Sequence, residues 1–180
     1  MAELKRVYWD SCCWLGLING EAKKIRAVDY VYNSAKAGGY EIWTSTISLI
    51  EVNRLSVEMN NPRPLADDGL DKIDEMFRQD CIKLIPLDME IGLDARKLIR
   101  TSIKNKYDAV HLASALRWSL DALHTYDNDD LLHLDGKLKC KNGLPLKICE
   151  PDDPPDGPLF ADKDNAAGEE DDAQETPAPA

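Results

Sequence analysis

Asp108 is an acid in a place where a carboxylate is unexpected. It lies near the start of the segment KYDAVHLASAL, residues 106–116, whose alanines, leucines and valine cover most of the circumference of a helix. This pattern predicts a buried helix. A lone carboxylate there must shift its pKa, find a partner or bind a metal, because burying its charge is costly. The sequence therefore raises the question of what Asp108 faces.

Three further acids occupy comparable places. Asp10 closes the predicted strand 4–10, and Asp127 closes the predicted strand 120–127. Glu51 interrupts the apolar pattern of a predicted helix, close to the side of that helix that should be buried. In a parallel α/β sheet, ligands collect beyond the carboxyl ends of the strands. We therefore expect Asp10 and Asp127 to lie at the edge where a ligand would bind.

Each of the four acids also has a purely structural explanation. Asp10 and Asp127 each precede a short predicted helix and could act as N-caps. Asp108 stands three residues after Asn105, where the partner in a capping box would lie. Glu51 could simply point to solvent. Taken singly, these explanations are as good as a functional one, but together they require four acids to meet at one edge by accident.

Carboxylates that converge repel each other unless a cation lies between them. Mg²⁺ and Mn²⁺ prefer carboxylate and water oxygens as ligands, and phosphate oxygens complete such a site. The corresponding chemistry is metal-assisted hydrolysis of a phosphodiester, in which the ions activate water and stabilise the leaving oxygen. The four acids therefore predict a site for Mg²⁺ or Mn²⁺ that cleaves phosphodiester bonds.

The elements that must position these acids alternate along the chain. Strands are predicted at 4–10, 40–45, 81–88, 120–127 and 144–150, and helices at 11–20, 21–39, 46–60, 70–79, 89–103 and 106–119, with a short helical turn at 128–134. Strands that alternate with helices favour a parallel sheet covered on both faces. The predicted fold class is α/β: a three-layer α/β/α sandwich with a central, mostly parallel sheet.

The charge is unevenly distributed. The formal net charge is −11, but residues 150–180 hold 11 of the 33 acids and one of the 22 lysines and arginines. The remaining 22 acids and 21 basic residues give residues 1–149 a net charge of about −1. Residues 150–180 have too few large apolar side chains to offset the entropy of ordering. We therefore predict one folded domain at 1–149 and an acidic disordered tail at 150–180.

The cysteines and the apolar runs bear on the compartment. The five cysteines form an odd set without a CxxC pair, which favours reduced thiols over disulfides or a zinc site. No run approaches the ~20 apolar residues of a membrane helix, and no secretory signal is recognisable at the start. These features predict a cytoplasmic protein without a membrane partner.

Four segments, in this order, resemble the PIN-domain ribonucleases and particularly their VapC-like toxin branch: YWDSCCWL, TSTISLIEV, KYDAVHLASAL and HTYDNDDLLHL. The family pattern is an Asp after the first strand, a Glu on a helix that follows small hydroxyl residues, an Asp that opens a buried Ala-rich helix, and a Thr-x-Asp after the next strand. The resemblance covers residues 4–149 and makes 1–149 a PIN-like nuclease domain.

The resemblance implies specific roles for the acids. Asp10, Glu51, Asp108 and Asp127 would be the catalytic residues and would bind one or two Mg²⁺ or Mn²⁺ ions. Ser11 and Thr125 would support the site or contact the scissile phosphate, and Asp130 would be an extra acid unless it acts as a cap or faces solvent.

The resemblance also implies partners. RNA would be the substrate, a small antitoxin would block the cleft, and the toxin would form a homodimer. Arg100, Lys104 and Lys106 could touch RNA phosphates, although a solvated basic face explains them equally well. The alternative function is a catalytically silent PIN-fold binding module that acts through protein or RNA contacts, which the near-neutral domain and the acidic tail favour slightly.

Three histidines remain outside this interpretation. His111, His124 and His133 have apolar neighbours, and their spacing matches no zinc motif. Ordinary structural roles are the preferred explanation for all three.

Overall fold

The computed structural model describes residues 4–65 and 67–155. Its centre is a five-stranded sheet in which every strand pair is parallel, with the strand order β3-β2-β1-β4-β5. The strands are β1 Lys5–Trp9, β2 Tyr40–Ser45, β3 Ile82–Ile85, β4 Ala122–His124 and β5 Lys147–Cys149. The parallel sheet confirms the predicted α/β class.

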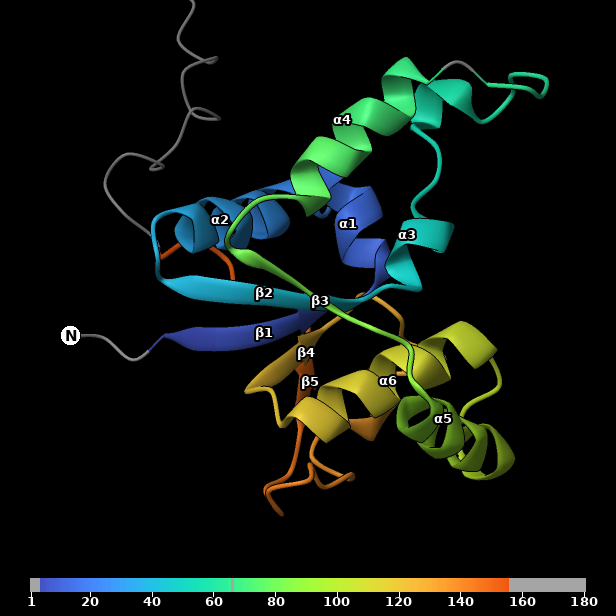
Figure 1. Ribbon diagram of the computed structural model, residues 1–180. Coiled ribbons are helices and arrows are strands. Elements are labelled where there is room, and N and C mark those ends of the chain that lie inside the picture. The colour runs from blue at the N-terminus through green and yellow to red at the C-terminus, as the bar shows by residue number, and fades with distance from the viewer. Residues whose placement is uncertain (1–3, 66, 156–180) are drawn as a thin grey trace, which may run out of the picture.

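Helices cover both faces of the sheet, which makes the three predicted layers (Figure 1). One face carries α1 Ser11–Ile18, α2 Ile25–Lys36 and α4 Asp68–Phe77, and the other carries α5 Met89–Thr101 and α6 Lys106–Trp118. The one-turn helix α3 Ser48–Glu51 follows β2, and two 3₁₀ turns lie at Ser56–Glu58 and Leu132–Leu134.

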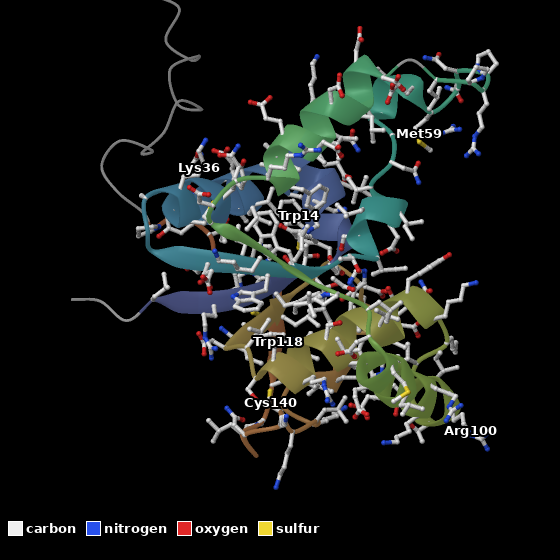
Figure 2. The ribbon with its side chains drawn as sticks, in the orientation of Figure 1. Trp14, Lys36, Met59, Arg100, Trp118 and Cys140 are labelled. Atoms are coloured by element: carbon white, nitrogen blue, oxygen red, sulfur yellow. The ribbon has the colours of Figure 1, made fainter. Side chains whose placement is uncertain are left out.

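Alternation along the strands divides the core into two parts. In β1, Val7 and Trp9 face the α1/α2 side, while Tyr8 faces the α5/α6 side, as the period of a strand requires. Trp14 of α1 anchors the first part, because its ring lies 4.8 Å from that of Trp9 and 4.7 Å from that of Phe77 (Figure 2). The sheet is therefore buried on both faces, and its strand ends are held rigidly.

The predicted helix at 46–60 is wrong. The helix α3 ends at Glu51, and the chain returns to a single helical turn only at Ser56–Glu58. Two backbone N–H groups find side-chain acceptors instead of helical ones: Ser56 N donates to Asn19 Oδ1 at 2.8 Å, and Leu55 N donates to Glu58 Oε2 at 2.8 Å. These bonds satisfy donors that a continuous helix would have satisfied by itself.

The beginning of the predicted tail contacts the domain. Pro151 is buried, and the Asp152 carboxylate accepts hydrogen bonds from Tyr40 Oη at 2.6 Å and from Lys5 Nζ at 3.1 Å. Residues 156–180, the larger part of the predicted tail, lie outside the described residues. Within the described ranges, each helix is too short or too polar to span a lipid bilayer.

Candidate active site

Asp10 follows β1 directly and is the N-cap of α1. Its side chain is 3% exposed, and Oδ1 accepts hydrogen bonds from Cys12 N and Cys13 N at 3.1 and 3.2 Å. The hydroxyl of Thr125, which follows β4, donates to Oδ2 of the same carboxylate. The capping role considered for Asp10 is therefore real, and the cap also lies beside the loop that carries Asp127.

Asp127 is held by the loop after β4. Its Oδ1 accepts from Asp129 N and Asp130 N at 2.8 and 2.9 Å, and its own N–H donates to Thr125 Oγ1 at 2.9 Å. Thr125 thus contacts both Asp10 and Asp127, as a supporting residue would. Asp130 has a different contact: its Oδ2 accepts from Asn105 N at 3.0 Å and so fastens this loop to the start of α6.

Glu51 does not point into open solvent. Its side chain is 17% exposed, Oε1 accepts from Ser11 Oγ at 3.3 Å, and Oε2 lies 2.7 Å from His111 Nε2. The short helix that carries Glu51 is anchored from below, because the buried Ser48 hydroxyl lies 2.6 Å from Thr44 Oγ1 at the end of β2. Ser11, predicted as a supporting residue, contacts one of the four acids.

Asp108 lies in the first turn of α6 and is 8% exposed. The capping box with Asn105 is not formed, because Asn105 N donates to Asp130 and Asn105 Oδ1 accepts from Tyr107 N. The pKa of Asp108 is raised to about 7, first by burial and then by the negative charges of Asp127, Asp10 and Glu51, while His111 opposes the increase. A cap therefore does not explain Asp108.

The structure brings the four acids to one place. Asp10 and Asp127 share Thr125, Ser11 extends from the first residue of α1 to Glu51, and Asp108 is within electrostatic range of Asp10, Glu51 and Asp127. This place is the carboxyl end of the sheet, on the right in Figure 1, where α3 and the first turn of α6 approach each other. The result is a cluster of carboxylates in which the charges of the neighbouring acids disfavour ionisation of Asp108.

Hard cations fit this donor set better than soft ones. Histidine, cysteine, aspartate and glutamate are the side chains that commonly bind metals. Within residues 4–65 and 67–155, one group of three such side chains has its ligand atoms within 4.8 Å of one another: Asp10, Cys12 and Cys13. Cys13 is a poor ligand, because burial raises the pKa of its thiol and its Sγ–H donates to His124 O. The four carboxylates lie farther apart, as like charges do, and oxygen donors are what Mg²⁺ and Mn²⁺ prefer.

Sequence reasoning missed two residues at this site. His111, which it assigned a structural role, contacts Glu51, and Cys12 donates its thiol proton to Asp10 Oδ1 and accepts from Tyr126 N. The signal for His111 was its position three residues after Asp108, on the same side of the helix. Cys12 is part of the first turn that Asp10 caps.

The three basic residues predicted to touch phosphate are exposed. Arg100 lies near the end of α5, Lys104 lies in the connection to α6, and Lys106 is the first residue of α6 (Figure 2 labels Arg100). Lys106 Nζ lies 5.3 Å from the centre of the Tyr107 ring. In the sequence, Lys106 precedes Asp108 by two residues, whereas Arg100 precedes it by eight.

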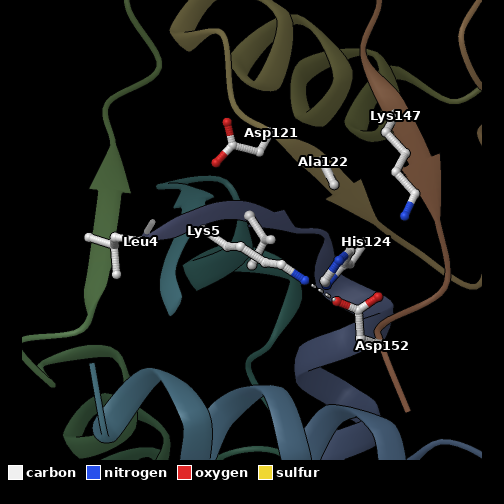
Figure 3. A pocket seen from close by; sticks show the side chains of 8 residues that line it. Leu4, Lys5, Asp121, Ala122, His124, Lys147 and Asp152 are labelled. Carbon is white, nitrogen blue, oxygen red and sulfur yellow. Dashed lines mark hydrogen bonds and ion pairs between the residues drawn. The ribbon is translucent and has the colours of Figure 1, made fainter. Parts of the chain in front are cut away.

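A separate cavity lies away from the acids. It has a volume of about 330 Å³ and includes Lys5, His124 and Asp152 in its lining, and none of the four acids lines it (Figure 3). Burial lowers the pKa of His124 to about 4, and its Nδ1 accepts from Trp9 Nε1 at 3.3 Å. The charges there are paired, because Lys5 and Asp152 form an ion pair.

Comparison with known proteins places this geometry in a family. No curated protein matches the chain. The solved structure of the Mycobacterium tuberculosis toxin VapC20, described as cleaving the sarcin–ricin loop, is 13% identical, with a TM-score of 0.54 over 68% of this chain and 91% of that chain. VapBC2 from Rickettsia felis, solved with a DNA fragment from the promoter, is 14% identical, with a TM-score of 0.54 over 82% of this chain and 99% of that chain.

These two likenesses concern the fold, whereas a family model matches the sequence itself. The model describes the PIN domain and matches residues 7–137, a range that contains all four acids. The chain belongs to the PIN domain family.

Proposed function

We propose that the protein is a metal-dependent endoribonuclease and the toxin of a toxin–antitoxin pair. The observation that carries the proposal is geometric: the hydrogen bonds of Thr125 and Ser11 hold three acids, Asp10, Asp127 and Glu51, at the carboxyl end of the sheet. Asp108 is buried beside them, and burial together with their charges raises its pKa to about 7. A cluster in which one acid is disfavoured by the others is incomplete without a cation. Membership in the PIN domain family supports nuclease activity.

The residues fit a divalent ion. Asp10, Glu51, Asp108 and Asp127 offer carboxylate oxygens at the carboxyl end of the sheet and would hold Mg²⁺ or Mn²⁺. When bound, such an ion polarises the phosphodiester and lowers the pKa of a water molecule. The domain's own share is to present the oxygens in a fixed arrangement: Thr125 orients Asp10, Ser11 orients Glu51, and backbone N–H groups orient Asp127.

The substrate carries negatively charged phosphates, and the proposed active site is itself acidic. Basic groups around the site are therefore needed to attract the RNA. Lys106 is the first residue of α6, the helix that carries Asp108, and Lys104 lies in the connection before it. Arg100 lies on α5. In the proposed function they contact RNA phosphates beside the scissile one. Each such contact contributes to affinity in a salt-dependent way.

An antitoxin would cover the apolar surface beside Glu51. Leu49 and Ile50 on α3, and Val57 and Met59 after it, are 39%, 62%, 79% and 61% exposed. Two of these side chains directly precede Glu51 in the sequence and two lie in the turn that follows, and large exposed apolar side chains of this kind suit a protein partner better than water. The similar Rickettsia felis structure is a VapBC complex, which supports an antitoxin partner for this chain. The second assembly that we propose is a homodimer. Light scattering of the purified protein would measure its molar mass and so test for it.

The test is cleavage of RNA by the purified protein with Mn²⁺, with and without EDTA. We expect Mn²⁺-dependent cleavage that Asp10→Asn and Asp108→Asn reduce to the level of the buffer control while circular dichroism stays unchanged. Asp88→Asn is the matched control, because Asp88 caps α5 through Ile91 N and is not among the charges that raise the pKa of Asp108.

Two results would count against the proposal. Undiminished cleavage by either folded variant would mean that the activity belongs to another site or to a contaminant. Binding of Mn²⁺ without cleavage of any RNA would favour the alternative, a catalytically silent binding module.

A further inference from the structure

His111 connects the interior of the domain to the acid cluster. Its side chain is fully buried, with Nδ1 2.7 Å from Tyr8 Oη and Nε2 2.7 Å from Glu51 Oε2. The Tyr8 and His111 rings meet edge to face, with centres 5.7 Å apart. Three elements, β1, α6 and α3, are joined through this one side chain.

The two partners of His111 determine which of its nitrogens carries the proton. A carboxylate only accepts hydrogen bonds, so His111 Nε2 carries a proton and donates to Glu51 Oε2. In the neutral ring Nδ1 is then the acceptor, and Tyr8 Oη donates to it. Ser45 N donates to the same Tyr8 oxygen at 2.9 Å and so holds the hydroxyl in place.

Glu51 depends on side-chain partners, unlike Asp10 and Asp127. Asp10 and Asp127 are held by backbone N–H groups of their own loops. Glu51 is the last residue of a four-residue helix, and its two carboxylate oxygens are bound by side chains, those of Ser11 and His111. A helix of a single turn does not restrain a carboxylate at its end.

We propose that His111 is a positioning residue for Glu51, in a relay that runs from Ser45 N through Tyr8 and His111 to the carboxylate. The proposal rests on the proposed function, because the orientation of Glu51 matters through the metal ion that it would bind. Both ring nitrogens are engaged, so His111 acts through Glu51 and not as a ligand. Groups that orient a ligand in this way affect metal affinity by about 10–100-fold.

The first test measures Mn²⁺ affinity with Mn²⁺ alone, by calorimetry and by thermal shift. His111→Leu removes the donor and should weaken Mn²⁺ binding about 10–100-fold. His111→Gln keeps an N–H group near the position of Nε2 and should recover most of the affinity. Tyr8→Phe, which keeps the ring and removes the hydroxyl, should give an intermediate loss.

His124→Gln is the matched control. His124 is nearly as buried as His111, and its imidazole is bound to Trp9. Its contact with Asp10 is made by the backbone carbonyl, which accepts from Asp10 N at 3.4 Å and which the substitution leaves in place. Its replacement should lower the melting temperature and leave the Mn²⁺ affinity of the folded protein unchanged. If His111→Leu does not fold, the comparison of His111→Gln and Tyr8→Phe with His124→Gln decides the question.

The second test needs no metal. Long-range proton–nitrogen NMR on the metal-free protein should show His111 protonated at Nε2, as donation to the Glu51 carboxylate requires. Equal Mn²⁺ affinity in wild type, His111→Gln and Tyr8→Phe, or a proton at Nδ1 in the wild type, would overturn the proposal while the nuclease function stands. Absence of Mn²⁺ binding by the wild type would overturn both.

Discussion

Asp108 and Asp152 are the same residue type in opposite electrostatic situations. Burial and the surrounding carboxylates together raise the pKa of Asp108 to about 7. Burial also acts on Asp152, but the hydrogen bonds from Tyr40 and Lys5 outweigh it and hold the pKa of that carboxyl below its usual range. The cation beside Asp152 is Lys5 of the same chain, whereas the charges around Asp108 are mainly those of other acids.

The difference separates an acid used for structure from one available for a ligand. A paired carboxylate such as Asp152 is satisfied in the folded protein and gains nothing from an added ion. A carboxylate among like charges is a cost to the folded state until a cation arrives, and perturbed groups of this kind cluster at functional sites. The comparison therefore predicts where added metal, substitution and pH will act on stability.

The largest expected effect is stabilisation by Mn²⁺. An ion that binds the folded state alone at 100 times its dissociation constant adds about 2.7 kcal/mol to the free energy of unfolding. Melting temperature should therefore rise with Mn²⁺ and return when EDTA is added in excess. The same titration with Asp10→Asn is the control, and an equal rise in that variant would place the ion elsewhere.

The next effect is stabilisation of the metal-free protein by Asp108→Asn. The pKa of Asp108 rises from 3.8 to about 7 on folding. Such a shift lowers the free energy of unfolding as pH rises from about 4 to about 7, because the folded state binds the proton more tightly than the unfolded state. Removing the charge should therefore stabilise the protein at pH 7.5 by roughly 1–2 kcal/mol, allowing for solvent screening.

Urea unfolding in EDTA at two pH values measures this effect. At pH 4.5 the native Asp108 is already protonated, so the stabilisation by Asp108→Asn should be small there. In saturating Mn²⁺ its sign should reverse, since the variant loses a ligand. A destabilised variant in EDTA at pH 7.5 would mean that Asp108 has a cationic partner after all.

The sequence predicted much of this architecture because most of its signals are local. Asp10, Asp108 and Asp127 were found from strand ends and from one apolar helix, and the parallel sheet followed from alternation of strands and helices. The predicted helix at 46–60 was wrong, and one distant contact contributes: Asn19, 37 residues away, accepts from Ser56 N. The neighbouring donor, Leu55 N, is taken by the side chain of Glu58.

The same limit explains why His111 was assigned a structural role. Glu51 is 60 residues away along the chain, and the Tyr8 contact is 103 residues away. Neither separation produces a periodic pattern, since both contacts depend on how α3, α6 and β1 are placed around the sheet. A histidine inside an apolar helix looks the same in sequence whether its partner is a carbonyl or a carboxylate of the active site.

The smallest expected effect is the loss of stability when Asp152, the paired acid, is replaced. Asp152→Asn keeps the shape of the side chain but removes the charge that faces Lys5, so it should destabilise the protein by about 0.5–1 kcal/mol at pH 7. A carboxyl whose folded pKa is lowered stabilises the protein above the unfolded value of 3.8, and this contribution is lost as pH falls below that value and through the lower folded pKa. The difference between the variant and the wild type in urea unfolding should therefore shrink as pH falls below 3.8, and Mn²⁺ should stabilise both proteins equally at pH 7. An altered Mn²⁺ response in Asp152→Asn would show that the two regions are coupled, and the separation between paired and unpaired acids would then fail.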